Sequence, residues 1–190
     1  PTRRGYDFAG WYIDALCTIP YEFPTTMPNE DTLVYAGWTP ASVYYTIEHY
    51  TQDIGGKGYT LYEREKITAL NGAFVTGLVK DYEGFTAPST QTVTIAADGS
   101  TVVNYQYTRN SYKVTWKPAG GNWNSDTNDK VVEHKYGAEI QAPEKPDRDN
   151  YEFVEWNPTY TAGSTMPAND VTYTAQWREI AQTYTITYNV

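Results

Sequence analysis

The sequence has little of what most catalytic, metal-binding and nucleic-acid-binding sites need. It contains one cysteine, two histidines and only 19% charged residues, with 14 basic against 23 acidic side chains. The lone Cys17 excludes a disulfide framework or a cysteine-based zinc cluster within one chain. A net charge of −9 without a basic cluster argues against nucleic acid as a partner. Because no run approaches about 18 apolar residues, no membrane-spanning segment is expected.

Aromatic residues, by contrast, are abundant. The chain carries 19 Tyr and 6 Trp, and 40% of its residues are hydrophobic. Disordered chains are poor in such residues, and tyrosine and threonine favour pleated, half-buried strands. We therefore expect a folded and mainly β protein.

Two stretches of the sequence recur. Residues 6–11 (YDFAGW) return as 151–156 (YEFVEW), and residues 26–31 (TMPNED) return as 165–170 (TMPAND). The first pair lies 145 positions apart and the second 139, so the connecting loop of the later copy is six residues shorter. Such a loop difference between fixed blocks indicates tandem structural repeats.

A third recurrence sets the phase of the repeats. Residues 111–116 (SYKVTW) return as 183–188 (TYTITY). This strand-like block opens a repeat that ends near Trp177, which predicts four segments along the chain. They are the second half of a repeat at 1–39, an unrelated module at 40–111, a complete repeat at 112–179, and the first strand of a following repeat at 180–190.

The middle segment predicts an α+β module. Residues 43–50 alternate as a strand does, and 58–65 follow a glycine-rich turn as the partner of a hairpin. Apolar residues of 74–82 fall at helical spacing, although Gly77 weakens the pattern. Residues 92–107 predict a second hairpin around Asp98-Gly99.

These patterns resemble two families of bacterial surface repeats. The Listeria/Bacteroides repeat, or internalin B-repeat, is similar to residues 1–39 and 112–190 through GYDFAGWY, TTMPNEDTLVYAGW, NYEFVEW and TMPANDVTYTAQW. The middle segment, with YYTIEHY, GYTLYEREK and DYEGFTAPSTQTVTIAADGSTVVNYQYTRN, resembles the MucBP (mucin-binding-protein) repeat. The resemblance implies small β-grasp, ubiquitin-like modules in an elongated tandem array. It also implies an extracellular stalk on the bacterial cell surface, attached to the cell wall through regions outside this chain.

The two repeat copies differ in ways that bear on their edges. Asn150 stands where the first copy has Gly5, and Glu155 stands where it has Gly10. The first copy also lacks the opening strand, and an unpaired sheet edge tends to recruit another strand. Residues 182–190 could fill that edge in a second molecule by head-to-tail strand exchange. Fraying of both ends is the alternative.

Aromatic side chains are the candidate ligand-binding residues. Trp11, Trp38, Trp156 and Trp177 occupy matched repeat positions and are expected to fill the cores. Trp123 lies in a polar loop without a repeat partner, where it could bind a ligand or fold back onto its own module. The tyrosines of the middle segment could contact a glycan or form cross-strand pairs that stabilise the sheet. These tyrosines are Tyr44, Tyr50, Tyr59 and Tyr105.

Catalytic and metal-binding constellations are not found. Alternation places Glu48 and His49 on opposite faces of their strand, which excludes a hydrogen-bonded dyad. The oxygen-bearing residues of 122–133 are spaced partly like a calcium loop, but position 6 is Thr127 and no flanking helices are predicted. Cys17 has no neighbouring base. We expect no enzyme activity, no cofactor and no metal.

Three functions remain compatible with the sequence. The first is a non-catalytic spacer, or stalk, of an adhesin whose partners are the neighbouring repeats of the same chain. The second is weak, multivalent binding of host glycoprotein or polysaccharide by the middle module. The third is an accessory module of a secreted polysaccharide-degrading enzyme.

Overall fold

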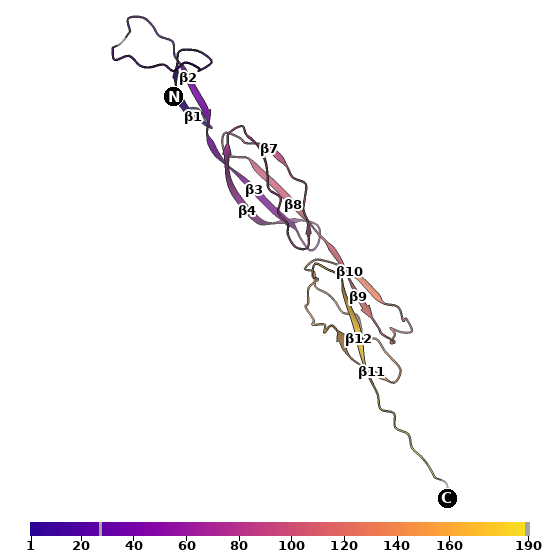
Figure 1. Ribbon diagram of the computed structural model, residues 1–190. Coiled ribbons are helices and arrows are strands. Elements are labelled where there is room, and N and C mark those ends of the chain that lie inside the picture. Colours follow the sequence, from indigo (N-terminus) through magenta and orange to yellow (C-terminus); the bar gives the residue numbers. More distant parts are fainter. Residues whose placement is uncertain (27, 189–190) are drawn as a thin grey trace. The chain divides into compact units, whose positions relative to one another are not determined.

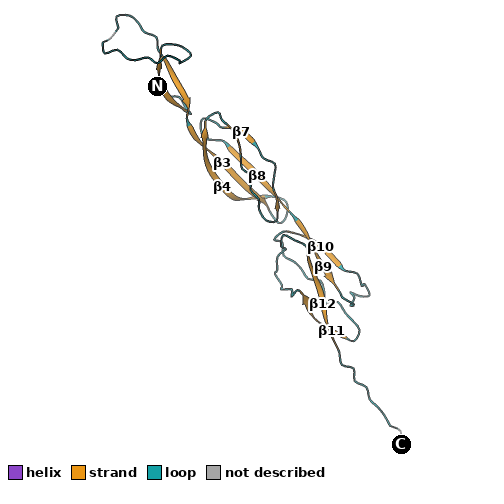
Figure 2. Ribbon diagram, viewed as in Figure 1, coloured by secondary structure: helices purple, strands orange, loops and turns teal. Residues whose placement is uncertain are grey.

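The computed structural model describes residues 1–26 and 28–188, and in this part of the chain all regular structure is β (Figures 1 and 2). The expectation of a mainly β protein is therefore confirmed. Among these residues no helix is long and apolar enough to span a bilayer. The described part of the chain contains twelve strands, namely β1 (Tyr6–Tyr12), β2 (Tyr35–Pro40), β3 (Ser42–Gln52), β4 (Tyr59–Leu70), β5 (Phe74–Thr76), β6 (Phe85–Thr86), β7 (Thr92–Thr94), β8 (Val102–Arg109), β9 (Ser111–Lys117), β10 (Lys130–Lys135), β11 (Tyr151–Asn157) and β12 (Val171–Glu179).

The chain divides into two compact units. The first contains Pro1–Thr51, Tyr59–Lys80 and Ala87–Tyr107. The second contains Gln52–Gly58, Asp81–Thr86 and the chain from Thr108 onward. The turn between β3 and β4 and the short strand β6 thus belong to the same unit as the complete repeat.

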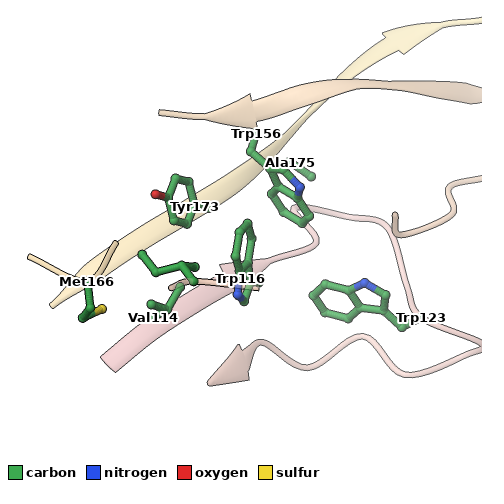
Figure 3. Packing of buried hydrophobic residues seen from close by; sticks show 8 residues of the cluster. Val114, Trp116, Trp123, Trp156, Met166, Tyr173 and Ala175 are labelled. Atoms are coloured by element: carbon green, nitrogen blue, oxygen red, sulfur yellow. The ribbon is translucent and has the colours of Figure 1, made fainter. Parts of the chain in front are cut away.

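The complete repeat forms one four-stranded sheet around an aromatic core. The strand order is β10-β9-β12-β11, with β9 and β12 parallel and the outer pairs antiparallel. Trp116 is fully buried, stacks on Tyr173 with 4.5 Å between ring centroids, and meets the edge of Trp156 at 4.9 Å (Figure 3). Aromatic side chains of this size each bury about 150–250 Å². The expectation that Trp156 belongs to the core is therefore confirmed.

The middle segment has a sheet with the same connectivity. Its order is β4-β3-β8-β6, with β3 and β8 parallel and β6 antiparallel to β8. In both sheets the first and last strands of the module are central and parallel, and the second and third lie at the edges. The predicted hairpin of 43–50 and 58–65 is confirmed as β3 and β4, which are neighbours in the sheet.

The helix predicted over 74–82 is wrong. Residues Phe74–Thr76 form β5, which pairs antiparallel with β7, and the chain beyond it is irregular. The helical spacing did not mark a buried face, because Phe74 is 80% exposed and Leu78 is 65% exposed. Gly77 instead passes so close to the sheet that a Cβ there would lie 2.8 Å from the Tyr105 hydroxyl oxygen.

The hairpin predicted over 92–107 is also wrong. The turn itself exists, since Gly99 has φ +72° and its N–H donates to the Ala96 carbonyl at 3.1 Å. Its two arms enter different sheets, because β7 pairs with β5 while β8 lies parallel to β3. Burial of alternate β8 residues explains the choice: Val103, Tyr105 and Tyr107 are all at most 1% exposed.

The first hairpin repeats the last one in register. β1 pairs with β2 as Phe8↔Trp38 and Trp11↔Ala36, with a bulge after Phe8. The pairing of β11 with β12 has the same bulge after Phe153 and the same offsets. Met27 of the repeated 26–31 block lies outside the described residues. The hairpin, including its bulge, is therefore encoded by the repeated blocks themselves.

Candidate functional site

Trp123 lies in the core and not on the surface of its loop. Its side chain is 7% exposed, and Figure 3 shows the indole within the same interior as Trp116. The indole N–H donates to the Glu144 carbonyl at 3.0 Å, and the Lys130 ammonium lies 4.5 Å from the ring centroid. The polar part of the side chain is satisfied and its face is covered, so the geometry favours the alternative in which Trp123 folds back onto its module.

The polar loop around Trp123 is held by its own side chains. Asp126 Oδ1 accepts hydrogen bonds from the backbone N–H of Asn128 at 3.0 Å and from its side-chain amide at 2.8 Å. The backbone hydrogen bond from Asn128 lowers the pKa of the Asp126 carboxyl. Within the described part of the chain, no three His, Cys, Asp or Glu side chains gather into a group that could hold a metal ion.

Three of the candidate tyrosines are accessible but do not share a face. Tyr44 is 54% exposed, and the Lys66 ammonium lies 4.4 Å from its ring centroid. Tyr50 is two strand steps from Glu48 and donates its hydroxyl to that carboxylate at 2.6 Å. Tyr59, 37% exposed, lies an even number of residues from Glu63 on β4 and so shares its face, opposite to Arg64. The three rings therefore form no common platform for a sugar.

The outer face of β3 and β4 carries a small polar network. Arg64 contacts Glu48 Oε1 through Nε at 2.8 Å and Nη2 at 2.7 Å. The hydrogen bond from Tyr50, followed by the contacts of Arg64, lowers the pKa of the Glu48 carboxyl. His49 points the other way and is fully buried, so the predicted separation of Glu48 from His49 is confirmed.

Tyr105 is a structural residue of the interior, so its side chain is not accessible for the glycan contact considered for it in the sequence. It is 0% exposed, its hydroxyl donates to the Gly77 carbonyl at 2.8 Å, and it accepts from the Gln91 N–H at 3.1 Å. Tyr107 acts likewise, since its hydroxyl accepts from the Lys80 N–H at 2.9 Å. The irregular crossover lacks a helix to satisfy its backbone, and these buried hydroxyls supply the partners instead.

His49 completes this buried group. Its Nδ1 lies 2.9 Å from the Tyr107 hydroxyl oxygen. Burial lowers the pKa of the His49 imidazole, and the nearby Lys80 ammonium lowers it further. The Lys80 ammonium in turn binds Glu63 and Glu65, and these hydrogen bonds raise its pKa. The histidine is thus a fully buried core residue linked to the crossover through the Tyr107 hydroxyl, with no open access to a substrate.

The most elaborate contacts outside the cores occur where the middle segment meets the complete repeat, inside the second unit. The Arg109 guanidinium donates through Nε to the Gln52 carbonyl at 2.7 Å and through Nη1 to the Tyr136 carbonyl at 2.8 Å. It also lies 4.7 Å from the centroid of the Phe85 ring. One side chain at the end of β8 therefore joins the end of β3 to the chain that follows β10.

Close packing surrounds this arginine. Tyr136 lies edge-on to Phe85 with ring centroids 5.8 Å apart, and its N–H donates to the Asn110 carbonyl at 2.9 Å. A Cβ at Gly84 would lie 2.2 Å from the Tyr136 ring, so only glycine fits there. Lys135 donates its ammonium to the Arg109 carbonyl at 3.3 Å. We call this group, Gln52, Gly84, Phe85, Arg109, Lys135 and Tyr136, the arginine junction.

A second junction joins the first hairpin to the middle segment inside the first unit. The Ala41 N–H donates to the Gly5 carbonyl at 2.9 Å, and a Cβ at Gly5 would meet Ala97 Cβ at 2.4 Å. Arg4 and Asp98 form an ion pair at 3.6 Å. We call Arg4, Gly5, Ala41, Ala97 and Asp98 the glycine junction.

Comparison with known proteins agrees with the repeats seen in the structure. The model of the Listeria-Bacteroides repeat domain matches residues 1–37 and 112–176, which is more than half of the chain. The chain belongs to the Listeria-Bacteroides repeat domain family. The match skips the middle segment, so this family accounts for the first hairpin and for the β9–β12 sheet.

Two curated relatives that this Listeria-Bacteroides repeat chain matches are longer proteins. A protein of Evansella cellulosilytica with the name "Putative membrane protein" is 26% identical over 164 residues, which cover 82% of this chain and 23% of that protein. Another from the same organism, named "Putative Gly-rich membrane protein", is 25% identical over 167 residues, covering 82% of this chain and 18% of that protein. The chain thus spans less than a quarter of either relative.

The repeat family explains the cores but not the junctions. Sequence reasoning pointed to aromatic residues as candidate binders, whereas the distinctive contacts outside the cores of this Listeria-Bacteroides repeat chain centre on Arg109 and Gly5. A signal for them existed: Arg109-Asn110-Ser111 is too short to act as a flexible linker, and an arginine there can reach backbone carbonyls on both sides. The partner carbonyls, however, belong to Gln52 and Tyr136, which the sequence alone does not bring together.

Proposed function

We propose that this chain is a non-catalytic spacer, part of the stalk of an adhesin displayed on the bacterial cell surface. In this proposal the repeat at 112–179 and the half-repeat at 1–39 flank a MucBP-like module at 40–111. The modules are β-grasp variants in which irregular chain replaces the crossover helix. Their task is to hold an adhesive region at a distance, for which stiffness matters and a ligand site does not.

The observation that carries this proposal is the arginine junction. A spacer holds its far end in place only if successive modules are fixed to one another, because a flexible linker would absorb the load. Arg109 uses two charge-assisted hydrogen bonds for this purpose, with donor–acceptor distances of 2.7 and 2.8 Å. Such bonds are roughly twice as strong as neutral ones. The packing of Tyr136 against Gly84 and Phe85 adds a steric restraint.

Ligand binding has less support from the geometry. Trp123 and Tyr105 are buried, the hydroxyl of Tyr50 is engaged by Glu48, and Tyr44 and Tyr59 lie on opposite faces of their sheet. Binding of host glycoprotein or polysaccharide therefore stays the second hypothesis. A glycan array with multivalent display tests it: reproducible binding that is lost in Tyr44→Ala would replace the spacer proposal.

The stiffness itself is tested by removing the arginine. Arg109→Ala leaves the carbonyls of Gln52 and Tyr136 without this donor. Both contacts are part-buried, so the cost should lie at the lower end of the range for buried groups, about 1 kcal/mol. ¹⁵N relaxation should give one rotational correlation time for Gln52–Gly58, Asp81–Thr86 and residues 112–178, which belong to one compact unit, in the unmodified chain and two different times in the variant. Arg64→Ala is the matched control, because that arginine binds Glu48 within a single sheet.

Two outcomes would overturn the proposal. One is independent tumbling of the two regions in the unmodified chain. The other is equal behaviour of Arg109→Ala and Arg64→Ala. Circular dichroism of both variants shows whether the sheets remain folded, so that loss of stiffness is separated from loss of structure.

A further inference from the structure

In each four-stranded sheet the first and last strands of the module are neighbours. The chain enters the middle segment through β3 and leaves it through β8, and these two strands run parallel. It enters the complete repeat through β9 and leaves it through β12, which are likewise parallel neighbours. Parallel strands begin at the same end of a sheet, so the entry and the exit of each module lie at opposite ends. A pull on the chain therefore draws the two strands of each pair in opposite directions along their own axes.

Such a pull loads all hydrogen bonds of the pair at once. The bonds of a parallel ladder are evenly spaced along the strands, so sliding one strand past the other must break them together. A pull that separates the strands from one end breaks the same bonds one after another. Unfolding under force is governed by the unfolding rate, and the direction of the pull therefore decides how much force the sheet resists.

The two parallel pairs differ in length. β3 and β8 are paired at six consecutive positions, from Thr46↔Val102 to Thr51↔Tyr107. β9 and β12 are paired at four, from Val171↔Val114 to Thr174↔Lys117. Because the bonds of each ladder are loaded together, the longer pair is expected to resist sliding at the higher force.

Buried side chains fix the register of the longer pair. Five of them are at most 1% exposed, namely Ile47 and His49 of β3 and Val103, Tyr105 and Tyr107 of β8. A slip by one residue turns every side chain of a strand to the other face of the sheet. β8 therefore has no neighbouring register along β3 in which its core residues stay buried.

The Tyr107 hydroxyl links β8 to two other segments. It lies 2.9 Å from Nδ1 of His49 on β3, and it accepts from the Lys80 N–H of the crossover at 2.9 Å. Tyr105 on the same strand donates to the Gly77 carbonyl of the crossover at 2.8 Å. These contacts must also break when β8 slides along β3, so they add to the resistance of the ladder.

The shorter pair is reinforced near its two ends. The Lys113 N–H donates to the Asp170 carboxylate at 2.8 Å, and the Trp177 indole donates to the Pro118 carbonyl at 3.0 Å. The first of these bonds is exposed, so water can replace it. These contacts support β9 and β12 but add no position to their ladder, and the ranking of the two pairs follows from six paired positions against four.

We propose that the β3–β8 pair, with the Tyr107 hydroxyl, is a clamp that bears tension along the chain and resists a higher force than the β9–β12 pair. When the chain is stretched, the complete repeat unfolds first and the middle segment stays folded. Each unfolded residue adds up to about 3.6 Å of extended chain, so unfolding of the repeat relieves the tension on the clamp. The use of such a clamp rests on the spacer function proposed above.

Pulling single molecules from two pairs of positions tests the clamp. In a Cys17→Ser background, handles at Thr39→Cys and Thr183→Cys load both parallel pairs lengthwise. Handles at Gly55→Cys and Thr183→Cys separate β3 from β8 at one end, while the repeat is still loaded lengthwise. All three positions are exposed, and a Cβ at Gly55 meets nothing within 4 Å. The two chains therefore share one fold and differ in the direction of the pull.

The handle at Thr183 lies in chain without regular structure. It precedes Asn189 and Val190, the last residues of the strand predicted over 180–190, which lie outside the described residues.

The released length identifies the unfolding steps. With the Gly55→Cys handle the middle segment releases residues 55–109 and the repeat releases 111–179, so the two steps differ by about 50 Å at 3.6 Å per residue. We expect the middle segment to unfold before the repeat with this handle, and after it, at a higher force, with Thr39→Cys. The repeat should unfold at the same force in both chains, which assigns the two steps of similar length seen with Thr39→Cys.

Tyr107→Phe tests the contribution of the hydroxyl. At constant force and with the Thr39→Cys handle, the substitution should speed unfolding of the middle segment by about fivefold, the factor that one average hydrogen bond represents. Tyr50→Phe is the matched control, because the Tyr50 hydroxyl binds Glu48 on the same strand. This control should leave the rate unchanged, and circular dichroism shows whether both variants keep their sheets.

Three results would overturn the proposal. They are equal unfolding forces of the middle segment with the two handles, a repeat that resists a higher force than the middle segment when both are loaded lengthwise, and equal unfolding rates of Tyr107→Phe and Tyr50→Phe. The test of the arginine junction measures rotational motion without force, so failure of the clamp and failure of the spacer proposal are distinguishable.

Discussion

The first and last hairpins of the chain have the same frame in different surroundings. Both keep the same register and the same bulge. Both open with a turn in which an arginine covers a tyrosine ring, Arg3 over Tyr6 at 3.9 Å and Arg148 over Tyr151 at 3.7 Å. The frame is therefore fixed by local sequence and does not depend on whether the neighbouring strand is present.

The aromatic group of the hairpin is shared as well. Phe8 lies edge-on to Trp11 at 5.4 Å and to Trp38 at 5.6 Å, and Phe153 meets its two tryptophans at 5.2 and 5.8 Å. The two copies differ in the solvent exposure of these aromatic side chains. In the complete repeat β9 and the core residues bury them, whereas in the first copy they remain partly exposed.

The two turns differ at the residues that point outward. The first has Arg4-Gly5, which meet Asp98 and Ala97 of the middle segment. The second has Asp149-Asn150 at the same positions, with Asn150 at φ +63°. An acidic residue and a side chain there would repel Asp98 and collide with Ala97. The two copies thus keep the same hairpin register but differ in the turn residues, and in the first copy these residues contact the middle segment.

The largest expected difference in the free energy of unfolding is between alanine variants of Trp156 and of its counterpart Trp11. Trp156→Ala removes a 6% exposed side chain and should lower the free energy of unfolding by about 3–5 kcal/mol. Trp11→Ala removes a half-exposed one and should cost about 1 kcal/mol. Urea unfolding resolved by amide hydrogen exchange assigns each loss to its own hairpin.

Equal losses for the two variants would mean that the first hairpin is already covered, and the contrast between the copies would disappear.

Exchanging the turn residues Gly5 and Asn150 should change the free energy of unfolding by a smaller amount, and only the change at Gly5 should be destabilising. Gly5→Asn installs the residue of the second copy, but its Cβ would lie 2.4 Å from Ala97 Cβ, so we expect a loss of about 1–3 kcal/mol. The reverse change Asn150→Gly removes an exposed hydrogen bond from the Gln182 side chain and should stay within about 0.5 kcal/mol. The loss in Gly5→Asn can be measured by the hydrogen-exchange protection of the Ala41 amide, which donates to the Gly5 carbonyl. A loss of similar size in both variants would contradict a specific fit at Gly5.

Much of this architecture could be predicted from sequence because it is local. The repeated blocks predicted the hairpin pairs, and alternation in 43–50 predicted β3 and its buried face. The helix at 74–82 could not be rejected on spacing, because the feature that forbids it is the approach of Gly77 to Tyr105, more than 20 residues away. The Asp98-Gly99 turn was correct, but parallel pairing of β8 with β3 overrode the local hairpin.

The candidate site was less predictable for the same reason. Exposure of Tyr105 and Trp123 depends on which backbone groups need a partner, and those are the Gly77 and Glu144 carbonyls supplied by distant segments. The arginine junction likewise joins residues 57 and 27 positions apart. A sequence pattern identifies the aromatic residues but not the distant backbone carbonyls to which they donate hydrogen bonds in the interior.

The smallest expected effect concerns the loop that is six residues longer in the first copy. The Asp14 carboxylate accepts from the Thr18 N–H, the Thr18 hydroxyl and the Ile19 N–H, the last at 2.8 Å. The hydrogen bond from Ile19 is the main cause of a pKa for Asp14 below the usual 3.8. Because the pKa is lowered in the folded state, the loop contacts are fully present above the ordinary value and are lost as the pH falls through the lowered one.

Amide chemical shifts of Thr18 and Ile19 should follow this titration with a midpoint below 3.8, and Asp14→Asn should abolish it while leaving the β1–β2 register unchanged. The loop of the second copy offers the internal control, since Glu155 accepts only from the Thr159 hydroxyl, at 3.2 Å, among the hydrogen bonds seen there. A midpoint at or above the ordinary value would show that Asp14 does not hold the loop. The longer loop would then be free to move, and the two hairpins would differ in the motion of this loop as well as in the burial of their aromatic side chains.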